Sequence, residues 1–244
     1  MVMLGTNRYT IVAAGLLIAG LMYGCGREET TVTIEGIATA FPEDAKSFPL
    51  AWRLDGVAPD VDPLPKEQIK AATEILRTTF GRYPDGFLSE HLTNVSVFAH
   101  MVFDGAGSAG TYAQPSTIYV SYLMADPIWM EEIAHSLIAA LLYHKYPDVI
   151  DQVDFDYQTN PPTGVSEDLL LERDVGYLKR GYLYPYSATS EEDDFATLAG
   201  ALMAGSKSAQ QDARDYKLLG EKMEKVKRFF AVLDKRFTED FFRR

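Results

Sequence analysis

Cysteine is almost absent from this sequence: the chain of 244 residues contains one, Cys25. A single cysteine cannot form an intramolecular disulfide, so no disulfide framework supports the fold. Basic residues are also scarce, with 23 Lys and Arg against 35 Asp and Glu and a formal net charge of −12. No block of Lys or Arg interrupts this acidity. The chain should therefore be repelled by phosphate backbones, and nucleic acid is not an expected partner.

Two common catalytic signatures are missing as well. The glycine-rich segment 104–110 lacks the Gly-Lys-Ser/Thr of a phosphate-binding loop, so it predicts a flexible loop and not a nucleotide site. No Gly-x-Ser-x-Gly elbow is present, and Cys25 lies in the N-terminal segment, so neither a serine nor a cysteine nucleophile is indicated. Hydrophobic residues make up 47% of the chain, which is enough for the core of one domain.

Residues 1–25 have the pattern of an export signal. Arg8 supplies a positive charge, and the run from Ile11 to Gly24 is uncharged and mostly apolar. A transmembrane helix needs about 20 apolar residues, so this run is too short to span a bilayer comfortably. Its length fits the apolar core of a signal peptide. We therefore exclude residues 1–25 from the folded domain.

The end of this run resembles the cleavage site of bacterial lipoproteins, in which the cysteine becomes the lipid-modified N-terminus. Gly24 directly precedes Cys25, but Leu21 lies one position early and Tyr23 is bulky where such sites have a small residue. We expect lipidation at Cys25, attachment to a membrane and a location in the cell envelope. An uncleaved anchor and plain secretion are the alternatives.

The rest of the chain predicts an α+β domain over residues 51–244, a small sheet followed by a helical half, with residues 26–50 as a polar tether. The helix over Ile128–His144 is apolar on nearly every side, so it should be the most buried helix and lie against the strands. Strands are expected over Thr31–Ile34, Val95–Phe103 and Ser116–Tyr122, and further helices from Lys66 to Gly81, over Ser166–Leu178, over Ser190–Gly205 and over Gln210–Phe237.

The buried helix carries Glu131, Glu132 and His135 in the pattern Glu-Glu-x-x-His. Zinc peptidases of the zincin type use His-Glu-x-x-His on a helix, because two imidazoles four residues apart share one face and the Glu activates a metal-bound water. Here Glu131 replaces the first His. The five residues alone are a weak signal, because a capped, buried histidine beside two solvated acids gives the same pattern.

A downstream segment strengthens the signal. Residues 179–196 closely resemble the zinc-binding metallopeptidase lipoproteins of the substrate-import-associated type, and the most specific matches are Pro185-Tyr186 and Asp194-Phe195-Ala196. The resemblance extends over about 117–237 and to the export signal. It implies a zincin-like fold and an acidic third metal ligand at the start of the following helix. The residues it assigns are Glu132 and Tyr186 as catalytic groups and Glu131, His135, Asp193 and Asp194 as metal ligands.

A second register of the same motif is open. Counting back from Tyr146-Pro147 places the first His of the motif on His135, so Ser136 takes the position of the base and Ala139 that of the next ligand. This register has no metal site. Thr197 stands where the family has a second Glu, which is a further departure from the pattern.

The chemistry of the first register predicts weak catalysis. Carboxylate ligands offset the charge of a metal and weaken its pull on bound water, and oxygen-rich sites favour manganese, calcium or magnesium over zinc. We therefore expect one divalent metal, such as zinc, or none. The leading interpretation is a membrane-anchored binding or accessory module with an impaired metallopeptidase-like site, whose partners are peptides or components of nutrient uptake. The alternative is an active metal-dependent hydrolase that uses Glu132 as its general base.

Overall fold

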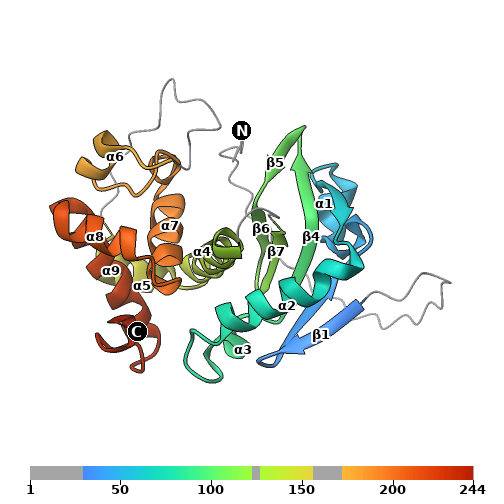
Figure 1. The fold of residues 1–244 in the computed structure, drawn as a ribbon, viewed down its shortest axis with the longest axis horizontal. Coiled ribbons are helices and arrows are strands. Elements are labelled where there is room, and N and C mark those ends of the chain that lie inside the picture. Colours follow the sequence, from blue (N-terminus) through green and yellow to red (C-terminus); the bar gives the residue numbers. More distant parts are fainter. Residues whose placement is uncertain (1–29, 123–126, 156–171, 244) are drawn as a thin grey trace.

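The computed structural model describes residues 30–122, 127–155 and 172–243. In these ranges the chain is α+β, with nine α-helices and a mixed sheet of seven strands (Figure 1). The signal segment, Cys25 and most of the helix expected over 166–178 lie outside the described residues. The strands are β1 (Thr30–Ile34), β2 (Ile37–Phe41), β3 (Asp60–Pro63), β4 (Asn94–Phe103), β5 (Ala106–Ser108), β6 (Gly110–Ala113) and β7 (Thr117–Ser121).

Strand β4 is the centre of the sheet, as its almost unbroken apolar sequence predicts. The main strand order is β1-β2-β4-β7-β6. The first half of β4 pairs in parallel with β2 and β7, and its second half pairs antiparallel with β3 and β5. Strand β6 pairs antiparallel with β7 and forms one edge.

Strand β1 confirms the strand expected over Thr31–Ile34, but this strand belongs to the sheet and not to a tether. Strands β1 and β2 fall inside the expected tether over 26–50, yet they pair with each other and β2 pairs with β4. Ile34, Ile37 and Phe41 are buried in the main core. Residues 30–41 therefore belong to the folded domain, because alternate side chains of these strands reach the core although most of the segment is polar.

Residues 104–110 contain a turn and strand β5, where the sequence predicts a flexible loop. Asp104 and Gly105 have φ angles of 49° and 81° and join β4 to β5. Glu35 and Gly36 have φ angles of 50° and 81° and join β1 to β2 in the same way. Two central residues with positive φ are what a type I′ turn requires, and this turn matches the twist of a hairpin. The glycines in these segments therefore mark tight turns.

The two faces of the sheet are covered differently. One face packs against α2 (Lys66–Phe80) and α4 (Pro127–Lys145) and forms the main core. The opposite face is covered by η1 (Ala45–Ser47) and α1 (Leu50–Leu54) through a small aromatic cluster. In that cluster, the Phe48 ring stacks on Tyr119 and Phe98 with centroid distances of 4.2 and 5.5 Å. Helix α1 and helix α4 therefore lie on opposite sides of the sheet (Figure 1).

The helical half is built around α7, which the sequence predicts almost to the residue. Ser190 caps it by accepting a hydrogen bond from the Asp193 backbone N–H at 3.0 Å. Helix α7 packs against α4, α8 and α9 and is buried from Asp193 to Met203. The elements of this half are α5 (Pro147–Val153), α6 (Val175–Lys179), η3 (Tyr186–Ala188), α7 (Glu191–Met203), α8 (Lys207–Asp215), α9 (Lys217–Leu233) and η4 (Phe241–Arg243).

Two helix predictions were wrong in detail. Among the described helices, α7 is buried more continuously than α4, because Ile133 and Leu137 of α4 are only half-buried. The single helix expected over 210–237 is two helices, α8 and α9, separated by the extended residue Tyr216. Gly220 allows the two to meet, because a side chain there would overlap the Ala213 carbonyl. None of the helices in the described ranges is both long and apolar enough to cross a membrane.

The burial of α4 makes a graded prediction about stability. Leu141 is 0% exposed, whereas Leu137 on the same helix is half-buried. We expect Leu141→Ala to lower the free energy of unfolding by about 2–5 kcal/mol, because truncation leaves a cavity in a packed core. Leu137→Ala should cost clearly less. Urea denaturation of both variants measures this difference, and equal losses would contradict the packing described for α4.

Candidate functional site

Helices α4 and α7 run antiparallel, and this fixes where the candidate site residues lie. Near the end of α4, Tyr143 donates a hydrogen bond to Glu191 and His144 lies 2.9 Å from Glu192. Near its start, the Glu132 carbonyl lies against Gly200, which has no room for a side chain. The acidic N-terminus of α7 therefore lies beside the C-terminal end of α4. His135 and Tyr143 are eight residues apart, which is about 12 Å along a helix.

Glu131 and His135 do lie together, on the side of α4 that faces the end of α2. His135 is 0% exposed, and its Nδ1 lies 3.0 Å from the Tyr83 hydroxyl. Its Nε2 lies 3.8 Å from Glu131 Oε1, and the Arg82 Nε lies 3.5 Å from the same oxygen. The imidazole and the guanidinium lower the pKa of Glu131, and burial lowers the pKa of His135. This face is a network of one carboxylate, one neutral imidazole and one guanidinium.

The Tyr83 hydroxyl determines which nitrogen of His135 is free. Burial raises the pKa of Tyr83, so its hydroxyl stays protonated and can donate to Nδ1. The tautomer that satisfies both neighbours then carries its proton on Nε2, facing Glu131. In this arrangement the imidazole lone pair that a metal needs is already used by Tyr83. Nε2 and Glu131 Oε1 have no closer hydrogen-bond partner among the described residues.

Glu132 points away from this network, because consecutive residues on a helix lie about 100° apart. Its Oε1 accepts a hydrogen bond of 3.1 Å from the Tyr184 hydroxyl, which comes from the segment before η3. Burial raises the pKa of Glu132, and the bond from Tyr184 opposes this shift. Glu132, the candidate base, is thus a buried carboxyl whose partner is a tyrosine. It lies on a different side of α4 from the contact between His135 and Tyr83.

Asp193 is held entirely by hydroxyl groups. Its Oδ1 accepts a hydrogen bond of 2.7 Å from Tyr186, and its Oδ2 accepts bonds of 2.6 and 2.7 Å from Thr189 and Ser190. Tyr186, expected to be catalytic, thus positions the start of α7. Both carboxylate oxygens of Asp193 are engaged at the end of α4 remote from His135.

Asp194 faces the opposite way, into the helical half. Its Oδ2 lies 2.6 Å from the Lys222 ammonium of α9, and that ammonium lies 4.0 Å from the centre of the Tyr182 ring. Burial raises the pKa of Asp194 to about 7, and the ammonium of Lys222 pulls in the opposite direction. This buried ion pair ties α7 to α9, which gives Asp194 a structural role.

The expected ligands therefore do not fit one shared metal. Glu131 and His135 are neighbours, but Asp193 and Asp194 each have their own partners elsewhere. Across residues 30–122, 127–155 and 172–243, no three His, Cys, Asp or Glu side chains converge as ligands would. In the antiparallel packing, Gly200 of α7 lies against Ser136 of α4, and Thr197 lies one turn before Gly200 on α7. Helix α7 therefore packs on Ser136, the residue that takes the position of the base in the second register. Thr197 there donates to the Asp193 carbonyl and bonds Ser187.

The sequence does not reveal which side chains contact Glu131, Glu132 and His135. Tyr83 and Arg82 lie about fifty residues before His135, and Tyr184 lies about fifty residues after Glu132, so no local motif connects them. The only signal was compositional, since the chain has 14 Tyr. The sequence also gives no sign of the partners of His144, which pairs with Glu192 and stacks on the Tyr112 ring.

The burial of His135 predicts a particular response to pH. Its pKa is about 6.5 in the unfolded chain and lower in the folded protein, so below pH ~6.5 the unfolded state binds a proton that the folded state refuses. Stability should therefore fall as the pH drops below that value. We expect His135→Gln to weaken this fall, measured by urea denaturation at pH 7.5 and 5.5. An unchanged difference between the two pH values would contradict the neutral, buried state.

Comparison of the chain with protein-family models, with curated proteins and with solved structures finds no match.

Proposed function

We propose that this chain is an exported binding or accessory module, anchored in the cell envelope through Cys25, with a metallopeptidase-like core that has lost its metal site. The single observation that carries this proposal is the state of Asp193. Three hydroxyl groups occupy its two oxygens, so the acidic residue at the position of the third ligand holds the start of α7. Peptides or components of nutrient uptake are the partners that the resemblance implies.

The zincin-like fold is part of this proposal. It is supported by a helix that runs along one face of a mixed sheet next to an antiparallel edge strand, β6, with α7 packed beside it. The acidic segment of α7 follows the Tyr184-Pro185-Tyr186 turn in the order that the resemblance predicts. These features resemble the arrangement expected of a zincin-like fold, whereas the missing metal ligands depart from the family pattern.

One observation favours the alternative, a metal-dependent hydrolase. Glu132 is 9% exposed, its pKa is raised by burial, and it holds a tyrosine hydroxyl. A general base poised between its charged and neutral forms has these properties. Among the described residues, however, the side chain bonded to Glu132 is Tyr184, and His135 is turned away to Tyr83. The binding module is the reading that the geometry supports better.

Zinc binding separates these two functions. We expect calorimetric titration of the full chain with zinc to show no binding at micromolar concentration. Glu131→His should not create it, although it pairs two imidazoles four residues apart, because the third donor is still missing. His135→Gln serves as the matched control that removes the remaining imidazole.

The contradicting result would be stoichiometric zinc binding by the natural chain that His135→Gln abolishes. In that case the carboxylates must rearrange around a metal, and hydrolysis of a peptide library should be tested with Glu132→Gln as the inactive control. A gain of tight binding in Glu131→His alone would show that only the first ligand had been lost.

The anchor has its own test. Because Cys25 is the only cysteine and closes the apolar run of the leader, Cys25→Ser should abolish incorporation of radiolabelled fatty acid. It should also release the protein from membranes or leave its leader uncleaved. Metabolic labelling and membrane fractionation measure both effects. Unchanged labelling in the variant would remove lipidation from the proposal.

A further inference from the structure

Half of the strongly exposed large apolar side chains in the described ranges lie on or beside α1. Six large hydrophobic residues of the described chain are strongly exposed, and three of them, Leu50, Leu54 and Val57, lie within eight positions of each other. They are 59%, 75% and 54% exposed. Leu50 and Leu54 are one turn apart on α1, so they share a face. We call these three residues the α1 tip.

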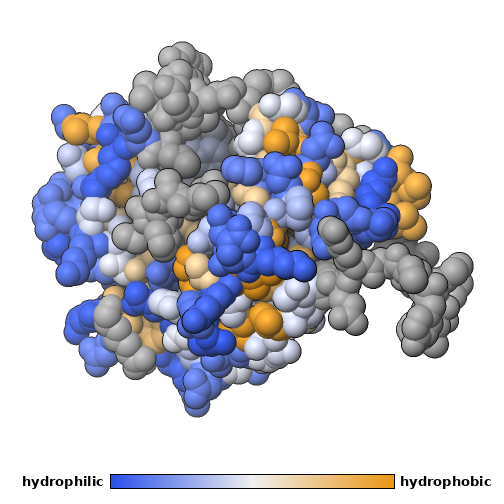
Figure 2. Space-filling view, turned by 45° about the vertical axis from the view of Figure 1, so that its right-hand side comes forward, coloured by the Kyte–Doolittle hydropathy of each residue, from blue (hydrophilic) through white to orange (hydrophobic). Residues whose placement is uncertain are grey.

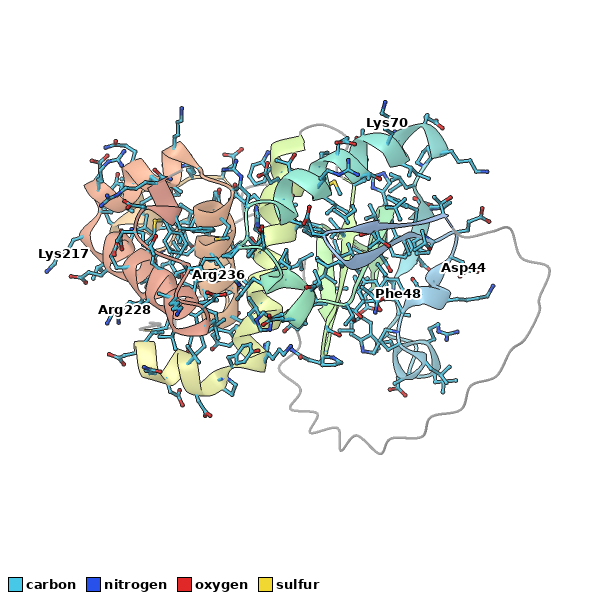
Figure 3. All side chains as sticks on the ribbon, turned by 90° about the horizontal axis from the view of Figure 1, so that it is seen from below. Asp44, Phe48, Lys70, Lys217, Arg228 and Arg236 are labelled. Carbon is cyan, nitrogen blue, oxygen red and sulfur yellow. The ribbon has the colours of Figure 1, made fainter. Side chains whose placement is uncertain are left out.

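The α1 tip lies at one end of the molecule, away from the helical half. Asp44 and Phe48, just before α1, lie at the opposite end from Lys217 and Arg228 of α9 (Figure 3). The Phe48 ring fixes α1 to the sheet through Tyr119 and Phe98. The α1 tip therefore projects from a segment that is packed against the sheet, and this packing keeps the three side chains at the surface. Hydrophilic side chains cover much of the surface seen in Figure 2.

The N-terminus of the described chain reaches the same end of the sheet. Thr30 pairs with Phe41, the last residue of β2, from which the chain continues directly to η1 and α1. Thr30 comes five positions after Cys25, and an extended chain spans at most about 17 Å over that length. A lipid on Cys25 would therefore hold this end of the domain next to the bilayer.

The charges around the tip indicate what kind of surface it meets. Lys46 is paired with Asp44 at 2.7 Å, and the Arg53 side chain bonds the Phe48 carbonyl, so both of these described cations beside the tip have partners within the domain. The chain as a whole carries −12. The net negative charge opposes binding to anionic lipid, so the apolar tip favours contact with zwitterionic lipid. Trp52 lies on the same helix, and tryptophan is enriched at membrane interfaces.

We propose that the α1 tip inserts into the surface of a zwitterionic phospholipid bilayer and orients the domain on the membrane. This inference rests on the proposed anchor at Cys25 and adds a second contact to it. One lipid chain gives weak, reversible attachment, and apolar side chains at the interface add to it. Two contacts at the same end of the domain would leave α4 and α7 at a fixed height and angle to the membrane.

The two tryptophans of the chain provide the experiment. Trp129→Phe leaves Trp52 on α1 as the only tryptophan, and Trp52→Phe leaves Trp129 on α4, across the sheet. The lipidated full chain is reconstituted in phosphatidylcholine vesicles with and without brominated acyl chains, which quench nearby tryptophan. We expect a roughly twofold loss of Trp52 emission, since interfacial side chains enter about 5–10 Å into the bilayer boundary. Trp129 emission should be unchanged.

A paired substitution separates insertion from mere proximity. Leu50→Ser with Leu54→Ser, in the chain that keeps Trp52, should abolish the quenching while the protein stays on the vesicles. Leu218→Ser with Val232→Ser is the matched control, because both residues are 45% exposed but lie on α9. It should leave the quenching intact. Circular dichroism of all variants verifies that they are folded.

The outcomes distinguish this inference from the proposed anchor. Protein that stays bound through Cys25 but shows unquenched Trp52 overturns the insertion and leaves the anchor standing. Natural chain that does not associate with vesicles overturns both. If Trp52 emission instead shifts with protein concentration without lipid, and sedimentation shows a dimer that the Leu50 and Leu54 substitutions dissociate, the tip binds a second copy and the membrane proposal is wrong.

Discussion

The close antiparallel packing of α4 and α7 is the constraint on which the rest of the site depends. Gly200 lets the two backbones approach at the Glu132 carbonyl, and the bonds of Tyr143 and His144 to Glu191 and Glu192 fix the other end. With both ends fixed, the helices cannot slide past one another. The acidic first turn of α7 is therefore held beside the end of α4, and His135 is left to the residues that follow α2.

This alignment also explains how so many acidic groups are accommodated near one pair of helices. Carboxylates that share a site repel one another and require a cation or a proton between them. Here each is neutralised separately: Glu131 by Arg82, Asp194 by Lys222, and Asp193 by hydroxyl donors. Glu132 accepts a hydrogen bond from the Tyr184 hydroxyl. Separate partners remove the repulsion that would otherwise have to be relieved by a bound metal.

The sequence predicts elements whose residues repeat or cap in a regular way. The starts of α2 and α7 and the central position of β4 follow from local periodicity and from the Ser190 cap. The break at Tyr216 does not, because the apolar spacing is similar on both sides and the turn depends on the contact of Gly220 with Ala213. The site was predicted as types of residue but not as an arrangement. Glu131 and His135 do meet, yet their partners come from residues about fifty positions away.

The hydroxyl bonds of Asp193 have a functional consequence. A catalytic base must exchange its partners during turnover, whereas a group that accepts from two or three fixed donors resists rearrangement. Taking Asp193 out of its place would break its bonds to the Tyr186, Thr189 and Ser190 hydroxyls, and each such bond contributes about 1 kcal/mol. These bonds therefore hold the start of α7 in place, and they oppose the ligand movements that a metal-assisted hydrolysis would require.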